Sequence, residues 1–227
     1  MVGSEAALLM LATVTSNREK PFQMNKNIKR TLIVVGIGFL LIAGCNTFLY
    51  FAFPVLNGEY YSKNDLIENY NSKTKQIAEL TIYIKSITPG DINVYIEFDG
   101  NNTLAIFDVD SDGIFNSNRD IKVNSLKTDT LLRKIGWTRE ILSTLKKKLD
   151  NANCISVASR EPCAIGFRRS GMGEYFYKVF NQPLNDSLKN KFNDGCTHVF
   201  YKDNIVLGYY GGALGPQCFE DFKYKGR

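Results

Sequence analysis

The sequence predicts an α+β fold, and two features of its patterning support this prediction. Between residues 63 and 87, apolar side chains recur every three or four residues, which is typical of an amphipathic helix. From residue 92 to 109, and again from 154 to 210, apolar and polar side chains alternate in short runs separated by turn-forming residues. The later runs follow one another without a crossover helix, so we expect a mainly antiparallel sheet.

The first predicted element of this domain is a long helix. Ser62 can cap its N-terminus, and Pro89 follows its expected end near Ile87. Two strands come next, over residues 92–99 and 103–109, with a Gly-Asn-Asn turn between them. The polar residues 110–120 then lead to a helical region and are expected to form a loop.

A helical insertion is predicted near residues 128–151. Its first helix ends at Gly136, and Thr138 caps a second helix with a leucine-rich inward face. The remaining chain is expected to form strands, with one short helical stretch over 184–192. The strand-like runs are residues 154–159, 163–169, 174–180, 197–202 and 205–210, and a two-residue turn at Asp203 joins the last two as a hairpin.

An apolar segment precedes the domain. Thr31–Gly58 carries no charge, and Lys26, Lys29 and Arg30 come directly before it. A helix over residues 32–53 would be about 33 Å long, enough to cross the hydrocarbon core of a bilayer. The basic flank predicts that the N-terminus lies in the cytoplasm. We therefore expect a short cytoplasmic tail over 1–30, a transmembrane anchor over 31–56, and an extracytoplasmic domain over 57–227.

A bacterial lipoprotein signal is the alternative interpretation of the same segment. Ile42, Ala43, Gly44 and Cys45 match a cleavage and lipidation box, and an apolar run precedes them. Initiation at Met24 would give a compact signal, which would make the upstream residues a start-site artefact. In this version Cys45 carries the lipid, and a tether follows it. Both alternatives place the domain on the outer side of the membrane in a bacterial envelope.

Charge and composition limit the partners of the domain. The formal net charge is +5, but residues 1–56 hold five basic and only two acidic side chains, which leaves the domain near neutrality. Nucleic-acid-binding proteins show a concentrated basic surface, so we expect no nucleic acid. Hydrophobic residues at 44% and aromatic residues at 12% indicate a packed domain rather than a disordered chain.

Four of the five cysteines lie in the predicted outer domain. An even number in an oxidising compartment favours disulfides. Cys154 and Cys163 bracket one predicted hairpin, and Cys196 and Cys218 bracket another, so local pairing is expected. Buried free thiols are the alternative.

One motif suggests a metal. Asp108, Asp110, Asp112 and Gly113 have the D-x-D-x-D-G spacing of calcium loops, with Asn116 at the ninth position. The twelfth position holds Arg119 instead of a bidentate carboxylate, so any calcium site formed by Asp108, Asp110, Asp112 and Asn116 would be weak. A rise in thermal stability in millimolar calcium would support it.

No set of acid, base and nucleophile is visible in the sequence. His198, the single histidine, lies two residues after Cys196, but a disulfide at Cys196 would exclude a catalytic thiolate. We therefore predict no catalytic residues and no cofactor beyond weak calcium. The predicted function is a membrane-tethered binding or envelope component with a protein or glycan ligand. The alternative is an envelope hydrolase whose site the sequence does not display.

Overall fold

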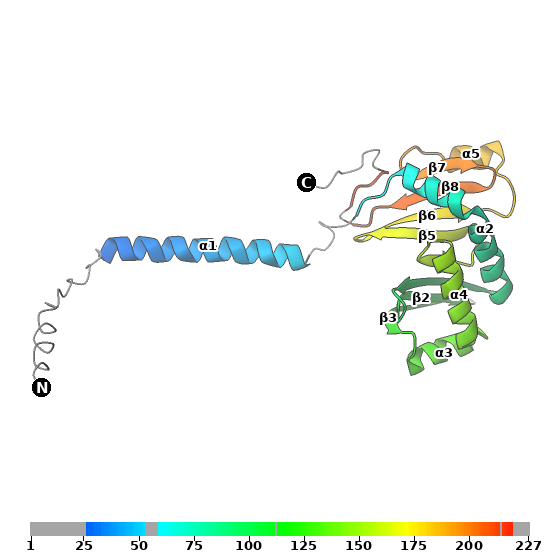
Figure 1. The fold of residues 1–227 in the computed structure, drawn as a ribbon, viewed down its shortest axis with the longest axis horizontal. Coiled ribbons are helices and arrows are strands. Elements are labelled where there is room, and N and C mark those ends of the chain that lie inside the picture. Colours follow the sequence, from blue (N-terminus) through cyan, green and yellow to red (C-terminus); the bar gives the residue numbers. More distant parts are fainter. Residues whose placement is uncertain (1–25, 53–58, 112, 214, 220–227) are drawn as a thin grey trace, which may run out of the picture. The chain divides into compact units, whose positions relative to one another are not determined.

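The computed structural model describes residues 26–52, 59–111, 113–213 and 215–219. They form two units, helix α1 (Lys26–Ala52) and a domain that holds the other elements (Figure 1). Helix α1 covers most of the charge-free segment, and the large apolar side chains described in it are exposed. In the part of the chain that the structure describes, no helix has both the length and the apolar character needed to cross a membrane. The anchor over 31–56 and the lipidation of Cys45 stay predictions.

An antiparallel sheet of eight strands forms the centre of the domain. The strand order is β3-β2-β1-β4-β5-β6-β8-β7 (Figure 1). Strands β1 and β4 meet in the middle, and their pairing runs from Tyr95 opposite Ala158 to Glu97 opposite Ser156. The strands are β1 (Ile92–Asp99), β2 (Thr103–Ser111), β3 (Ile114–Lys122), β4 (Ser156–Ala158), β5 (Cys163–Ser170), β6 (Gly173–Val179), β7 (His198–Lys202) and β8 (Ile205–Tyr210).

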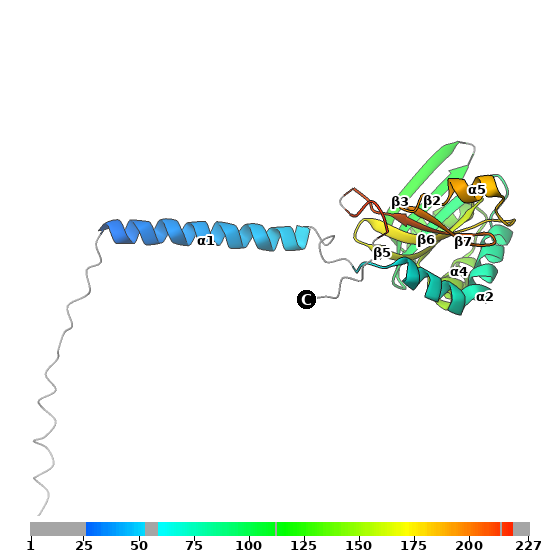
Figure 2. The ribbon, with the colours of Figure 1, turned by 90° about the horizontal axis from the view of Figure 1, so that it is seen from above.

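Helices α2 (Lys63–Ile87) and α4 (Arg139–Asn151) cover one face of this sheet (Figure 2). A capping box between Ser62 and Asp65 starts α2, which then buries one apolar stripe against the strands. The hydroxyl of Tyr177 on β6 donates to the carbonyl of Leu66 on α2 at 2.9 Å, so helix and sheet are also joined by a buried hydrogen bond. Helix α3 (Leu126–Lys134) precedes α4.

Among the described elements, only one short helix lies on the opposite face of the sheet, at one end of it. The short helix α5 (Asp186–Lys191) lies over the β8–β7 end, where a small apolar cluster of Phe180, Leu184 and Val206 is buried (Figure 2). The middle of this face carries polar side chains instead, as described below. We call this surface the open face.

The predicted α+β class and the antiparallel sheet are confirmed. The helical insertion is found at residues 126–151, close to its expected position. The expectation of a loop over 110–120 is wrong, because β3 occupies most of this segment. Strand β3 is an edge strand with exposed side chains, so it lacks the apolar alternation that marks a half-buried strand. Its pairing with β2 holds it in place.

Candidate functional site

Polar side chains from four neighbouring strands meet on the open face. Alternation along β1 directs Val94 and Ile96 into the core, and places Tyr95 and Glu97 on the other side. Partners from the second half of the domain join them there. The resulting open-face cluster consists of Tyr95, Glu97, Ser156, Arg169 and Glu174.

Glu97 and Arg169 form the ionic part of the cluster. Nε and Nη2 of Arg169 donate to the two carboxylate oxygens of Glu97. The side chain of Glu97 is only 4% exposed, whereas that of Arg169 is 33% exposed. Buried carboxylates are usually paired, and a two-point contact with a guanidinium group is one of the strongest pairings available to them. The hydrogen bonds with Glu97 in turn raise the pKa of Arg169.

A single phenol joins this ion pair to a second carboxyl group. Tyr95 Oη lies 3.0 Å from Glu97 Oε2 and 3.1 Å from Glu174 Oε1, and Ser156 Oγ donates to the same Glu174 oxygen at 2.7 Å. A phenol has one proton, so it can donate to only one of the two carboxyl groups. The other group needs a proton of its own to hydrogen-bond with Tyr95. Burial raises the pKa of Glu174, and we therefore assign the protonated form to Glu174.

Gly166 on β5 makes room for the carboxyl group of Glu174. This glycine pairs with Ser156 on β4 and with Phe176 on β6. A Cβ atom at position 166 would lie 2.0 Å from Ser156 Oγ and 2.2 Å from Glu174 Oε1, far inside contact distance. The Glu174 carboxyl group thus lies over bare backbone, and a side chain at position 166 would displace it.

A shallow hollow of about 620 Å³ adjoins the cluster. Carboxylates and guanidinium groups both line it, together with apolar side chains, so neither charge dominates. Its lining includes Glu97, Ile106, Arg119, Arg169 and Met172. A second hollow of about 720 Å³ lies beside α4, where Arg139 and Lys146 are already paired with Asp129 and Asp150.

The raised pKa of Glu174 leads to a testable pH dependence of stability. Because the pKa of Glu174 is raised in the folded state, its contribution to stability is present below the unfolded pKa and lost as the pH rises through the folded pKa. Glutamine stays neutral at every pH and still has an oxygen for Ser156 and an N–H for Tyr95. We therefore expect Glu174→Gln to gain stability relative to the wild type between about pH 4 and about pH 8.

Urea denaturation at the two pH values measures this difference. Glu79→Gln, a change at a half-exposed position of α2, is the matched control and should show no comparable trend. A Glu174→Gln variant that loses the same stability at both pH values would contradict the assignment of the proton.

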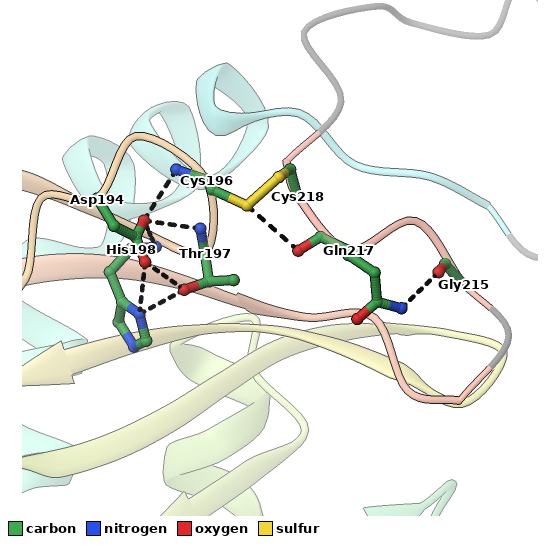
Figure 3. The surroundings of a disulfide bond; sticks show 7 residues. All are labelled: Asp194, Cys196, Thr197, His198, Gly215, Gln217 and Cys218. Atoms are coloured by element: carbon green, nitrogen blue, oxygen red, sulfur yellow. Dashed lines mark hydrogen bonds and ion pairs between the residues drawn. A yellow bond between two sulfur atoms is a disulfide. The ribbon is translucent and has the colours of Figure 1, made fainter.

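A second polar cluster lies at the start of β7, beside a disulfide (Figure 3). Cys196 and Cys218 are bonded, which ties the C-terminal segment to the loop before β7. Asp194 Oδ1 accepts from the backbone N–H groups of Cys196, Thr197 and His198, each at 2.8 Å. Burial opposes ionisation of Asp194, but hydrogen bonds from Thr197 and these N–H groups prevail and lower its pKa.

The predicted local pairing of cysteines is right for one pair and wrong for the other. The Cys196–Cys218 disulfide is confirmed and excludes a Cys196 thiolate beside His198. Cys154 and Cys163 are free and buried. Ser156 pairs with Gly166, so these two cysteines lie about five residues, or roughly 16 Å, apart along the β4–β5 ladder, too far for a disulfide. Burial raises the pKa of both thiols to about 12.

The predicted calcium ligands are spread over two paired strands. Asp108 and Asp110 lie on β2 and Asn116 lies on β3, while Asp112 is outside the described residues. Asp108 forms an ion pair with Arg119. Among the described residues, no group of three or more His, Cys, Asp or Glu is placed to hold a metal ion. The calcium site stays a prediction that this arrangement does not favour.

The open-face cluster was not predicted from the sequence. The available signal was the alternation within the strand predicted over residues 92–99, which puts Tyr95 and Glu97 on its polar side. Their partners Ser156, Arg169 and Glu174 are between 59 and 79 positions away, and only the strand order brings them together. Comparisons with protein families, curated proteins and solved structures found no match for this chain. The fold and site define a two-faced antiparallel α+β domain, with helices on one face and a polar cluster on the other.

Proposed function

We propose that the domain is a binding module on the outer side of the membrane, tethered by the N-terminal segment, whose open face engages a protein partner. The observation that carries this proposal is the open-face cluster, which lies on the part of the sheet that α2, α4 and α5 leave uncovered. Glu97 and Ser156 are buried within it, and Arg169, 33% exposed, is the member of the ion pair that reaches the surface. A polar network with a fixed geometry on a broad sheet surface is suited to recognition by complementary groups.

The shape and composition of the open face favour a protein over a small molecule. Small-molecule sites are usually deep and mostly apolar, whereas the hollow beside the cluster is shallow and lined by charges of both signs. Tyrosine and arginine are enriched at protein interfaces, and both occur here as Tyr95, Arg119 and Arg169. The exposed Met172 and Tyr210 add apolar area near the cluster.

The proposed location rests on the sequence and on one covalent bond. The charge-free segment with its basic flank supports a tether whose N-terminal side is cytoplasmic. The Cys196–Cys218 disulfide supports an oxidising compartment, because such bonds are rare in the reducing cytosol.

Site-specific photo-crosslinking tests the binding surface. A benzophenone amino acid at Ile106, which lines the hollow of the open face, should give a discrete product in envelope membranes. The same amino acid at Ile82, which is 69% exposed on α2, is the matched control and should give none. Tyr95→Phe removes only the shared hydroxyl and should weaken the product.

Two outcomes would overturn this proposal. Equal products from Ile106 and Ile82 would show that the open face has no special role, and the absence of any product at Ile106 would show that it is not a protein-binding surface. A product removed by glycosidases would replace the protein with a glycan ligand.

One observation favours an envelope hydrolase as a second candidate. Glu97 and Glu174 both contact the Tyr95 hydroxyl, and burial raises the pKa of Glu174, as it does in the acid of an acid and base pair. However, Glu97 is buried and held by Arg169, so it is not free to act on a substrate. We expect neither the wild type nor Glu174→Gln to release reducing ends from purified cell-wall polysaccharide. Release by the wild type that Glu174→Gln abolishes would favour the hydrolase.

A further inference from the structure

A chain of hydrogen bonds links Lys178 on β6 to Asp194 before β7. Lys178 Nζ lies 2.8 Å from His198 Nε2, and His198 Nδ1 lies 2.8 Å from Thr197 Oγ1. Thr197 Oγ1 in turn lies 2.6 Å from Asp194 Oδ2. The four side chains thus form one continuous line of hydrogen bonds. It joins an amine, an imidazole, a hydroxyl and a carboxylate.

The direction of each hydrogen bond in this line follows from the number of protons. The Asp194 carboxylate can only accept, so Thr197 gives it its single hydroxyl proton. The Thr197 oxygen must then accept from His198, which places the imidazole proton on Nδ1. Nε2 of His198 is left with a lone pair, and this lone pair accepts from Lys178. The histidine is therefore held as a base that faces the amine.

The carboxylate end of the line is fixed in place. Asp194 accepts three backbone N–H groups, and the disulfide at Cys196 anchors the same loop (Figure 3). Figure 3 shows the His198 ring directed away from this loop, with Asp194 and Thr197 at its base. The line thus has the arrangement of a nucleophile, a base and a group that orients the base.

The Lys178 ammonium group is half-buried, and among the described residues no carboxylate lies at ion-pair distance from it. The rings of Phe192 and Phe176 lie 4.8 Å and 5.8 Å from Nζ, and these cation–π contacts favour the ammonium form. The titratable groups that face it are His198, Lys191 and Asp194. Burial lowers the pKa of Lys178, Lys191 lowers it further, and Asp194 opposes them. Burial also lowers the pKa of His198, which keeps the imidazole neutral.

We propose that Lys178 is a reactive amine that attaches covalently to a ligand carrying an aldehyde, with His198 as its base and with Thr197 and Asp194 as positioning residues. This proposal concerns a different site from the open-face cluster and does not depend on it. Desolvation beside a second cation is a known way to activate a lysine for attack on a carbonyl group.

The proposed step is the formation of an imine. His198 Nε2 takes a proton from the Lys178 ammonium group, which frees the nitrogen lone pair. The nitrogen bonds to the aldehyde carbon while the electrons of the C=O π bond move to oxygen. Transfer of one proton from this nitrogen to the oxygen then gives a neutral carbinolamine. Loss of water, which takes the proton back from His198, leaves a C=N bond between Lys178 and the ligand.

Trace reductive methylation of the folded protein tests this proposal. Formaldehyde is the aldehyde probe, cyanoborohydride reduces each imine to a stable amine, and peptide mass spectrometry gives the extent at every lysine. We expect Lys178 to react at lower pH than Lys75, whose side chain is 85% exposed. His198→Phe keeps the ring contacts with Phe176 and Phe192 but removes the base, and should slow Lys178 on the order of tenfold relative to Lys75.

A second variant keeps the test valid if His198→Phe does not fold. Thr197→Val is close in shape, cuts the line between His198 and Asp194, and should also slow Lys178 without changing Lys75. Reaction of Lys178 that has the same pH profile as Lys75, or that is unchanged in both variants, would overturn the proposal.

Discussion

Replacing Arg169 with methionine is expected to lower the free energy of unfolding by about 3 kcal/mol or more at neutral pH. Methionine keeps much of the length of the side chain but removes both donors to Glu97. Glu97 is 4% exposed, so its charge would then be buried without a cation. An unpaired buried charge costs far more than the loss of an exposed ion pair.

Urea denaturation measures this loss, and two further variants define its cause. Arg119→Met breaks the pair with Asp108, where the arginine side chain is 49% exposed, and should cost about 1 kcal/mol or less. The double variant Arg169→Met with Glu97→Gln removes the unpaired charge and should recover part of the lost stability. Equal losses in Arg169→Met and Arg119→Met would refute a special role for the Glu97–Arg169 pair.

Removal of the disulfide should have an effect of similar size. Cys196 and Cys218 are 22 residues apart in sequence, and closing a loop of this length in the unfolded chain corresponds to about 3 kcal/mol. Reduction also releases the segment that carries Phe219, whose ring packs against Tyr175 and Tyr209. We therefore expect reduction, or Cys196→Ser with Cys218→Ser, to lower the denaturation midpoint.

Two controls separate this effect from general thiol chemistry. Dithiothreitol should not destabilise the double serine variant any further, because Cys154 and Cys163 are already free. Thiol counting on the unfolded, unreduced domain should give two reactive groups, from these same cysteines. Four reactive thiols would disprove the disulfide.

Local patterns in the sequence predicted the elements that bury one face. Helix α2 and strand β1 carry strong apolar periodicity, and the hairpin β7–β8 has a clear turn at Asp203, so these elements lie close to their expected positions. Strand β3 was missed because an exposed edge strand has little need of apolar side chains. Strand β3 is held by backbone hydrogen bonds with β2, and such bonds do not require particular side chains that a sequence pattern would reveal.

The open-face cluster and the Lys178 line were beyond reach of the sequence for a different reason. The members of the open-face cluster meet only because strands that are distant in sequence lie side by side, and Glu97 and Arg169 meet across β4. In the second group, Lys178 meets His198 from a strand 20 positions earlier. The pairing error at Cys154 had the same origin, because spacing along the chain gave no measure of the offset along the ladder. The Cys196–Cys218 pair was predicted correctly because a hairpin truly lies between the two residues.

The shortness of β4 has a mechanical consequence. Strand β4 has only three residues, and it alone connects strands β3, β2 and β1 to strands β5, β6, β8 and β7 within the sheet. We call this short connection the joint. The open-face cluster crosses this joint, since Tyr95 and Glu97 come from one side of it and Arg169 and Glu174 from the other. A partner that drew any of these side chains away would loosen the joint as well as occupy the surface. The same four side chains would then both contact the partner and hold the two halves of the sheet together, so that binding on the open face would weaken the connection between these halves.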